Sequence, residues 1–199
     1  MSRWPKIHGR RTLEPGKGFR LEEVDLEFSN GARRRFTRMK SKGLGAVIVV
    51  AMLDDDTVLL VREYAAGMEH YELGLVKGRL DNDETPLEAA NRELQEEAGF
   101  GAHRLEELTQ LSLAPTYMTH VTSVVLARDL YPSRLEGDEP EELEVVPWPI
   151  ADLHSLTARP DCTEGRSIAA LYIVRDHLAQ ERESGNAVDG VHTDNPQEP

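Results

Sequence analysis

The sequence predicts an α+β protein. Apolar segments with the two-residue alternation of β-strands lie before and after one amphipathic helical segment at residues 86–98. A longer helical segment at 163–180 follows the last of these predicted strands. Periods of 2 and about 3.6 residues distinguish the two kinds of segment. The length of 199 residues fits one domain of moderate size with additional segments at its ends.

Composition excludes several classes of protein. The net charge of -13 argues against a bare nucleic-acid backbone as partner, although an acidic surface can bind phosphate compounds through divalent cations. The single Cys162 excludes an internal disulfide framework and suits a reducing compartment. No apolar run approaches the roughly 18 residues of a membrane helix, and the N-terminus lacks a secretory pattern. We therefore expect a cytoplasmic protein without membrane or nucleic-acid partners.

The N-terminal region is predicted to contain an arm and a hairpin. Residues 1–18 are rich in Gly, Pro and Arg and predict an extended arm. Residues 19–44 predict an antiparallel β-hairpin, because Asn30-Gly31 favours a two-residue turn in which both residues adopt positive φ. Apolar and acidic residues alternate on its first strand, the apolar ones being Val24, Leu26 and Phe28. Arg33, Arg34 and Arg35 fall on the returning strand, where a solvated face and an anion-binding role are both open.

Residues 45–183 have the apolar content of a folded domain. A second hairpin opens this domain, and its nearly all-apolar first strand at 46–53 is predicted to be central. We assign Asp54–Asp56 to the hairpin turn rather than to a metal site, because aspartate favours turns. The segment 70–83 contains several glycines and is predicted to be irregular. Residues 184–199 contain too few apolar residues to fold and are predicted to form a disordered tail.

The helix at 86–98 has clear start and stop signals. Thr85 is a suitable N-cap, Pro86 suits the first helical position, and Glu88 completes a capping box. Gly99 is placed where a helix ends in a left-handed residue. At 100° per residue, one stripe of apolar side chains about 80° wide faces the core. This stripe contains Leu87, Ala90, Leu94 and Ala98.

Three glutamates crowd a second sector of this helix. Glu93, Glu96 and Glu97 lie near its C-terminus, where the helix dipole disfavours each negative charge by about 0.3–1 kcal/mol. Glu97 lies nearest the apolar stripe, so we expect its carboxylate to be partly desolvated. Arg92, four residues before Glu96, neutralises part of the charge. A solvated acidic face and a site for a hard cation such as Mg²⁺ or Mn²⁺ are the two interpretations.

A longer pattern favours the cation. From Gly78 to Phe100 the chain reads G-x5-E-x7-R-E-U-x-E-E-x-G-U, where U is a bulky apolar residue. Every fixed position and every spacing of this pattern matches the signature of the Nudix hydrolases. The chain therefore resembles that family.

The resemblance implies a fold and a reaction. The Nudix fold is a mixed β-sheet sandwiched between helices, with the signature as loop, helix and loop. The family hydrolyses nucleoside diphosphates linked to another group, with divalent cations neutralising the charge that develops. The implied metal ligands are Glu93 and Glu97, assisted by Glu96 and by the backbone carbonyl of Lys77. By the same resemblance Arg92 orients the carboxylates, and Glu84 supports them from behind.

Residues outside the signature indicate a branch of the family. The N-terminal hairpin and Pro115 resemble the ADP-ribose pyrophosphatases, and fragments such as "REYAAG" and "DLYPSRLEGDEPE" resemble bacterial members that accept several ADP-linked compounds. The implied substrates are ADP-ribose, NADH and diadenosine polyphosphates, cleaved with Mg²⁺ or Mn²⁺ to release AMP. In this branch an acidic loop supplies the general base and a further metal ligand. We place these roles at Glu139 and Glu141, with Glu97 as the competing base.

The resemblance also suggests how substrate is held. Members of the branch often carry an arginine after the aromatic residue of the second hairpin, but here Ala65 follows Tyr64. Arg62, or an arginine of the first hairpin such as Arg33, is predicted to bind substrate phosphate instead. Tyr117 is a candidate for stacking on adenine, with a core position as the alternative.

A homodimer is predicted by the same branch. Its members pair through their N-terminal hairpins, and residues 19–44 suit that role. One chain would then lend Phe28 or an arginine to the adenine pocket of the other.

Two alternatives to this function are kept open. A non-catalytic Nudix-like module would bind ADP-ribose or NAD compounds without cleaving them. Such modules usually lack one or more signature glutamates, whereas this chain has them all. Within the enzyme class, a pyrophosphatase for sugar nucleotides or coenzyme A is the rival.

Overall fold

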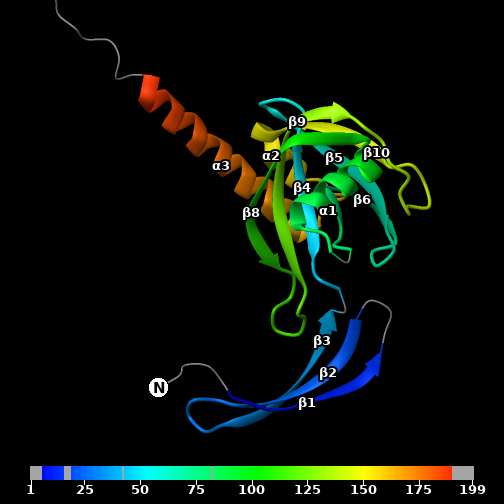
Figure 1. Cartoon of the computed structure of the whole chain (residues 1–199), viewed down its shortest axis with the longest axis vertical. Helices are drawn as coiled ribbons and strands as arrows, with labels where there is room; N and C mark the ends of the chain where they lie inside the picture. Colours follow the sequence, from blue (N-terminus) through cyan, green and yellow to red (C-terminus); the bar gives the residue numbers. More distant parts are fainter. Residues whose placement is uncertain (1–5, 16–18, 42, 82, 190–199) are drawn as a thin grey trace, which may run out of the picture.

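A computed structural model describes residues 6–15, 19–41, 43–81 and 83–189. Its main body is a β-sheet with helices on both faces, and a second sheet made by the N-terminal residues projects from that body (Figure 1). The predicted α+β class, with a mixed sheet sandwiched between helices, is confirmed. No helix in the described part of the chain is long and apolar enough to cross a membrane.

The main sheet is built around its most buried strand, β4. Within the described residues it has seven strands in the order β10–β5–β4–β9–β8, with β6 beside β5 and β7 beside β4. Strand β4 runs parallel to β9 and antiparallel to β5 and β7. The strands are β4 (Ala46–Met52), β5 (Thr57–Ala65), β6 (His70–Gly74), β7 (Val76–Arg79), β8 (Phe100–Ser112), β9 (Val121–Pro132) and β10 (Glu144–Pro149).

Helices cover both faces of this sheet. On β4, Val47, Val49 and Ala51 belong to a buried cluster with α1 (Pro86–Glu93) and the turn after it. The intervening residues of β4 belong to a second cluster with α2 (Leu153–Thr157) and α3 (Gly165–Asp189). Alternate side chains of a strand point to opposite faces, so a central strand between two helical layers must be apolar throughout. This confirms the central position predicted for the strand at 46–53.

The second hairpin has the predicted turn. The backbone amide of Asp56 donates to Oδ1 of Asp54 at 2.9 Å, and the amide of Leu53 donates to the carbonyl of Thr57 at 2.8 Å. These contacts are typical of an aspartate-stabilised turn. Asp54–Asp56 therefore have the turn role that was predicted for them.

The N-terminal region differs from its prediction. Strands β1 (Lys6–Pro15), β2 (Phe19–Glu27) and β3 (Arg33–Ser41) form a three-stranded antiparallel sheet. Most of the predicted arm at 1–18 is thus an edge strand, and residues 1–5 and 16–18 lie outside the described residues. Acidic residues of β2 pair with basic residues on both neighbours, as in Arg11–Glu23 and Arg35–Asp25, each at 2.7 Å. Cross-strand charge pairs of this kind favour the added strand.

The hairpin between β2 and β3 has a longer loop than predicted. The amides of Phe28 and Gly31 donate to the carbonyls of Ala32 and Phe28, each at 2.9 Å, so the loop spans residues 28–32. Gly31 has the expected positive φ of 80°. The Asn30 side chain instead accepts a hydrogen bond from the amide of Ala32 at 3.0 Å. In turns, asparagine either adopts a positive φ or hydrogen-bonds the backbone two residues further on. Asn30 does the second, and the loop is longer as a result.

Two other segments are more regular than predicted. Residues 70–83, predicted to be irregular, contain strands β6 and β7, which are too short to show alternation. Helix α3 continues through Asp189, so the predicted disordered tail is wrong for residues 184–189. A helix already nucleated by packing extends into polar sequence because each further residue adds a hydrogen bond. Residues 190–199 lie outside the described residues.

Candidate active site

Helix α1 begins as the sequence predicts. The Thr85 hydroxyl accepts a hydrogen bond from the amide of Glu88 at 3.3 Å, and the Glu88 carboxylate accepts one from the amide of Thr85 at 2.8 Å. This is the expected capping box. The helix ends at Gly99, which has the predicted left-handed conformation with φ 75°. Both ends of the glutamate-bearing segment are therefore fixed by local sequence.

The second half of that segment is not an ordinary α-helix. Residues Leu94–Ala98 form a π-helical turn, in which the amide of Gly99 donates to the carbonyl of Leu94. Wide turns of this kind occur often at functional sites. Glu96 and Glu97 lie on the turn, whereas Glu93 precedes it. The turn therefore sets how the three carboxylates stand relative to one another.

Two of these glutamates are buried. Glu93 is 9% exposed and Glu97 is 6% exposed, which exceeds the partial desolvation predicted for Glu97. The carboxylate of Glu93 lies directly over the backbone of Gly78, where a Cβ atom would be 1.8 Å from its carboxyl carbon. The amide of Lys77 donates to Oε2 of Glu97 at 3.4 Å. The first residues of the signature thus form the surface on which its glutamates rest.

Arg92 organises the signature carboxylates. Its Nε and Nη2 donate to Glu84 at 2.8 and 3.0 Å. Its Nη1 donates to Glu93 at 2.8 Å and to Glu96 at 3.1 Å, and Nη2 also reaches the carbonyl of Arg79 at 3.0 Å. These contacts, led by the hydrogen bonds that Arg92 donates to Glu84, hold the pKa of Arg92 well above its ordinary value. The guanidinium is a fixed cation inside the cluster, in agreement with the orienting role that the resemblance implies.

The carboxylates open into a pocket of about 570 Å³. Within the described residues, seven acidic and three basic side chains line this pocket. The acidic ones are Asp81, Glu93, Glu96, Glu97, Glu136, Asp138 and Glu139, and the basic ones are Lys77, Arg79 and Arg92. Such an excess of negative charge around partly buried groups calls for additional cations.

Burial and repulsion raise the pKa of three of these carboxyl groups. Burial, reinforced by repulsion from Glu93 and Glu63, raises the pKa of Glu97 to about 8, although nearby Lys77 opposes the shift. Burial also raises the pKa of Glu93, against the opposing effect of Arg92. The pKa of Glu139 is raised by burial and then by Glu63 and Asp138. Carboxylates that disfavour their own charge in this way are candidates for cation binding and for proton transfer.

The pocket fits hard divalent cations. Its donor set consists of carboxylate oxygens and backbone carbonyls, which Mg²⁺ and Mn²⁺ prefer. The missing Cβ of Gly78 lets the Glu93 carboxylate lie against the backbone of the segment that precedes the helix. Glu93, Glu96 and Glu97 would hold such ions, together with the carbonyl of Lys77.

Residues of the acidic loop at 136–142 line two neighbouring hollows. Glu136, Asp138 and Glu139 line the carboxylate pocket, as the prediction for Glu139 requires. Glu141, predicted as a further metal ligand, lines a neighbouring hollow that Glu96, Glu136 and Glu139 also line, and it accepts a hydrogen bond from the Tyr71 hydroxyl at 2.7 Å. The structure therefore brings Glu139 to the signature glutamates and leaves Glu141 outside their pocket.

The predicted substrate-binding residues do not line this pocket in a single chain. Arg62 donates to Glu144 at 2.9 Å and to Asp161 at 2.7 Å. On the N-terminal sheet, Arg33 pairs with Glu27, and Phe28 packs edge-on against Phe36 with ring centroids 6.3 Å apart. Tyr117 is 53% exposed in the loop before β9, where its carbonyl accepts a hydrogen bond from the amide of Met39 at 2.7 Å.

The alternation of side chains along β5 explains why Arg62 does not line the carboxylate pocket. On β5, Leu59 and Val61 belong to the cluster under α1, whereas Val58 and Leu60 belong to the cluster under α2 and α3. Arg62 continues the second set and therefore lies on the face away from the signature helix. Glu63 continues the first set, and its carboxylate accepts a hydrogen bond from the Lys77 ammonium beside the pocket. Glu63 was not predicted as a site residue, although the period-2 pattern carried the necessary signal.

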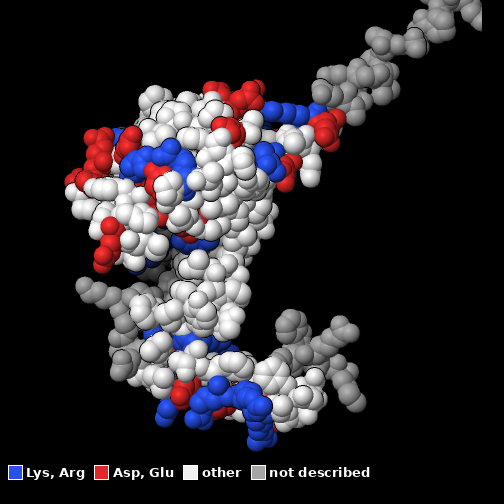
Figure 2. Space-filling model, turned by 180° about the vertical axis from the view of Figure 1, so that it is seen from behind, with Lys and Arg blue, Asp and Glu red and all other residues white. Residues whose placement is uncertain are grey.

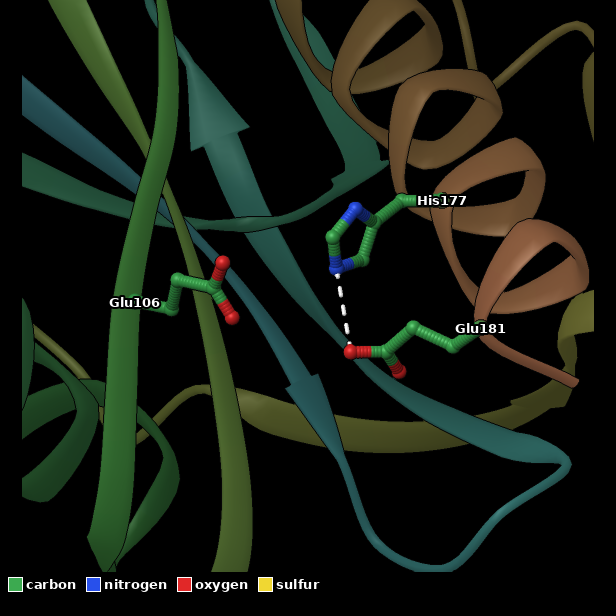
Figure 3. A group of neighbouring side chains, drawn as sticks. All are labelled: Glu106, His177 and Glu181. Atoms are coloured by element: carbon green, nitrogen blue, oxygen red, sulfur yellow. Dashed lines mark ion pairs between the residues drawn. The ribbon is translucent and has the colours of Figure 1, made fainter. Parts of the chain in front are cut away.

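A separate group of potential metal ligands lies between β8 and α3. Glu106 on β8 faces His177 and Glu181 on α3, and Nε2 of His177 is 3.3 Å from Glu181 (Figure 3). The Arg128 guanidinium donates hydrogen bonds to both carboxylates. It makes a bidentate contact with Glu181 at 2.6 and 3.2 Å and a single contact with Glu106 at 3.5 Å. Because a cation is already present, we interpret this group as an ion-pair cluster.

The fold and the pocket define a class of protein, a hydrolase with a carboxylate-lined site on a helix beneath a mixed sheet. The profile of the NUDIX domain matches residues 43–169, and that of the NudE-type Nudix hydrolase N-terminal domain matches residues 5–38. The chain belongs to the Nudix hydrolase family and is a Nudix pyrophosphohydrolase.

Individual relatives agree with this assignment. The chain is 49% identical over 174 residues to the ADP compounds hydrolase NudE of Escherichia coli, covering 87% of this chain and 93% of that protein. It is 28% identical over 168 residues to the ADP-ribose pyrophosphatase of Bacillus subtilis, covering 83% and 90% of the two chains. The crystal structure of an ADP compounds hydrolase superposes with a TM-score of 0.81 at 47% identity, over 89% of this chain and 95% of the other.

The contact between Gly78 and Glu93 predicts a selective loss of activity. In Gly78→Ala the new Cβ would occupy the place of the Glu93 carboxylate. We expect pyrophosphohydrolase activity to fall by about 100-fold or more, because a 1 Å misplacement of a catalytic group costs on that order. Steady-state hydrolysis and thermal unfolding of the variant measure the two effects separately. Gly67→Ala is the matched control, since nothing lies within 4 Å of its new Cβ. Equal activity of the two variants would contradict the packing described.

The raised pKa of Glu97 predicts how stability depends on pH. Between its unfolded pKa of about 4.3 and the folded value of about 8, the folded protein binds a proton that the unfolded chain does not. Without divalent cations, folding stability must therefore decrease as pH rises through this window. We expect the melting temperature to fall more steeply from about pH 5 to about pH 8.5 in the wild type than in Glu97→Gln. Parallel slopes in scanning calorimetry would contradict the burial of this carboxyl.

Proposed function

We propose that this chain hydrolyses the diphosphate bond of ADP-linked nucleotides with Mg²⁺ or Mn²⁺ and releases AMP. ADP-ribose, NADH and diadenosine polyphosphates are the proposed substrates. The observation that carries the proposal is the pocket in which Glu93 and Glu97 are buried beside Glu139. The similarity to an ADP compounds hydrolase at 49% identity supports the choice of ADP-linked substrates.

The proposed roles of the signature residues follow from their contacts. Glu93, Glu96 and Glu97 would hold the divalent cations, which supply neutralising charge and lower the pKa of a bound water. Arg92 contacts Glu93 and Glu96 and would hold both carboxylates in one orientation. Glu84 would keep Arg92 in place from the opposite side.

Glu139 is the proposed general base. It approaches the pocket from a loop rather than from the signature helix, so it can accept a proton without giving up a cation. Its raised pKa brings the carboxylate closer to the value that suits proton transfer near neutral pH. Glu97 is more deeply buried and rests on the Lys77 amide, which suits a ligand better than a base. Asp138, which neighbours both Glu93 and Glu139, is proposed to add negative charge for the cations in place of Glu141.

The alternatives are less well supported. A binding module without activity would not need Glu93, Glu96 and Glu97 assembled with Arg92 around one pocket. A pyrophosphatase for sugar nucleotides or coenzyme A would use the same carboxylates, so the substrate panel below must separate it. The single Cys162 suits a reducing compartment and so supports a cytoplasmic location.

A substrate panel tests this function. With Mg²⁺ or Mn²⁺, the wild type should release AMP from ADP-ribose and NADH and leave UDP-glucose and coenzyme A intact. Glu97→Gln should lower kcat by about 10³-fold or more, because a metal ligand is lost while the side-chain shape is kept. Chromatographic identification of products measures both results. The control is Glu107→Gln, a change at an exposed position on β8. Cleavage of UDP-glucose alone, or an unchanged rate in Glu97→Gln, would contradict the proposal.

We also propose that the chain forms a homodimer through the sheet β1–β3. This sheet projects from the body and carries exposed apolar side chains, namely Ile7, Leu13, Phe19 and Phe36. The register sets Ile7 beside Leu26 and Phe36 beside Val24, so both lie on one face. Lysine and arginine side chains gather over the same sheet at the lower end of Figure 2. A second copy would cover the apolar face and bring Phe28 or Arg33 to the partner's site.

Sedimentation tests the dimer. The wild type should sediment at about twice its chain mass of 22.3 kDa. Phe36→Asp should shift the equilibrium toward the monomer and raise KM, since a partner's contribution to the nucleotide site would be lost. Leu53→Asp, which changes an exposed apolar residue in the β4–β5 turn, is the control. A wild type that sediments as a monomer with full activity would refute this arrangement.

A further inference from the structure

Lys77 carries a side chain that the roles given so far do not use. Its backbone amide donates a hydrogen bond to the Glu97 carboxylate, and its backbone carbonyl is a proposed metal ligand. Its ammonium donates instead to the carboxylate of Glu63, which comes from β5. Both side chains are about one quarter exposed. A pair so open to solvent contributes little to stability, so folding alone gives little reason for it.

Lys77 belongs to the lining of two adjoining hollows. Lys77 lines the carboxylate pocket and also an adjoining hollow of about 340 Å³, whose walls include Met118, His120 and Arg166. A diphosphate joins two larger groups, so a substrate with its phosphates near the glutamates must extend from the pocket into neighbouring space. Lys77 is on the wall shared by the two hollows.

Arg92, one of the two other basic residues that line the pocket, is already occupied. The Arg92 guanidinium donates hydrogen bonds to the carboxylates of Glu84, Glu93 and Glu96 and to the carbonyl of Arg79. Lys77, in contrast, has three N–H donors and uses one of them on Glu63 within the described residues. A lysine ammonium binds phosphate as a compact point charge and needs no particular fork geometry.

Glu63 has a specific use in this arrangement. The charge of the Lys77 ammonium opposes the raised pKa of both Glu97 and Glu139, so the ammonium lies in their neighbourhood and, without Glu63, could turn toward either one. In that position it would compete with divalent cations for the same oxygens. The hydrogen bond to Glu63 fixes the ammonium on a carboxylate that lies outside the proposed ligand set.

We propose that Lys77 binds the diphosphate of the nucleotide substrate and that Glu63 is the positioning residue that holds its ammonium for this contact. The proposal rests on the proposed function for its ligand class. It assigns a binding role to a side chain whose backbone alone was implicated by the signature. It also assigns a role to Glu63, which lies outside the signature.

The test measures binding rather than turnover. The probe is α,β-methylene-ADP, a nucleotide with a non-hydrolysable diphosphate, titrated calorimetrically into the full chain at saturating Mg²⁺. We expect Lys77→Met and Lys77→Gln to weaken binding by about 10- to 100-fold, the size of one charge-assisted hydrogen bond. Lys77→Arg should bind within a few-fold of the wild type. Glu63→Gln should weaken binding less than Lys77→Met, and it should have no further effect in the Lys77→Met background.

Controls separate this role from a structural one. Mn²⁺ affinity, measured by electron paramagnetic resonance, should stay unchanged in all these variants. Glu144→Gln, which removes a carboxylate from neighbouring Arg62 outside the pocket, should bind the probe like the wild type.

Several results would overturn the proposal. Binding by Lys77→Met within twofold of the wild type would remove the role of Lys77, and so would a parallel loss of Mn²⁺ affinity. An equal effect of Glu63→Gln with and without Lys77 would remove the positioning role. If the wild type cleaved no ADP-linked compound but the probe bound as described, the proposed function would fail while this inference stood.

Discussion

The structure depends on burying two like-charged groups side by side. Glu93 and Glu97 are almost completely removed from water within one helical segment. Desolvation and mutual repulsion both oppose their ionisation, and each becomes stronger as the surroundings become less polar. The chain meets this cost with a guanidinium on one side, a backbone amide on the other and a pocket that admits further cations. The glycine at position 78 and the wide turn at 94–98 are both consequences of the same requirement.

The wide turn resolves a conflict between packing and chemistry. Leu94 and Ala98 must remain in the core under β4, whereas Glu96 and Glu97 must reach the pocket. In a regular α-helix these side chains follow a fixed rotation of 100° per residue. A π-helical turn changes that rotation over one turn only, so the apolar anchors keep their places while the acidic residues are redirected. The left-handed Gly99 then ends the helix at once and starts β8.

Local signals in the sequence were sufficient for much of this arrangement. The cap at Thr85, the stop at Gly99 and the all-apolar β4 depend on interactions within a few residues or on burial from both sides. The edge strand β1, the π-helical turn and the position of Glu141 could not be predicted in this way. Strand β1 forms ion pairs with acidic side chains of β2, such as Glu23. Glu141 accepts a hydrogen bond from Tyr71, which lies on β6 and is distant in the sequence. These contacts join residues that no local pattern connects.

Strand β5 shows how a single register separates structure from chemistry. Arg62 and Glu63 are adjacent, yet they serve opposite faces of one sheet. Arg62 joins Glu144 of β10 to Asp161 beyond α2, and together with Arg159 it holds the pKa of Asp161 well below its usual range. Glu63 accepts a hydrogen bond from Lys77, which lines the pocket. Because a shift of one residue would exchange the two faces, the pairing of β5 with β10 and β6 fixes which charge reaches the site. The chemistry of the pocket is therefore set partly by hydrogen bonds at the far edge of the sheet.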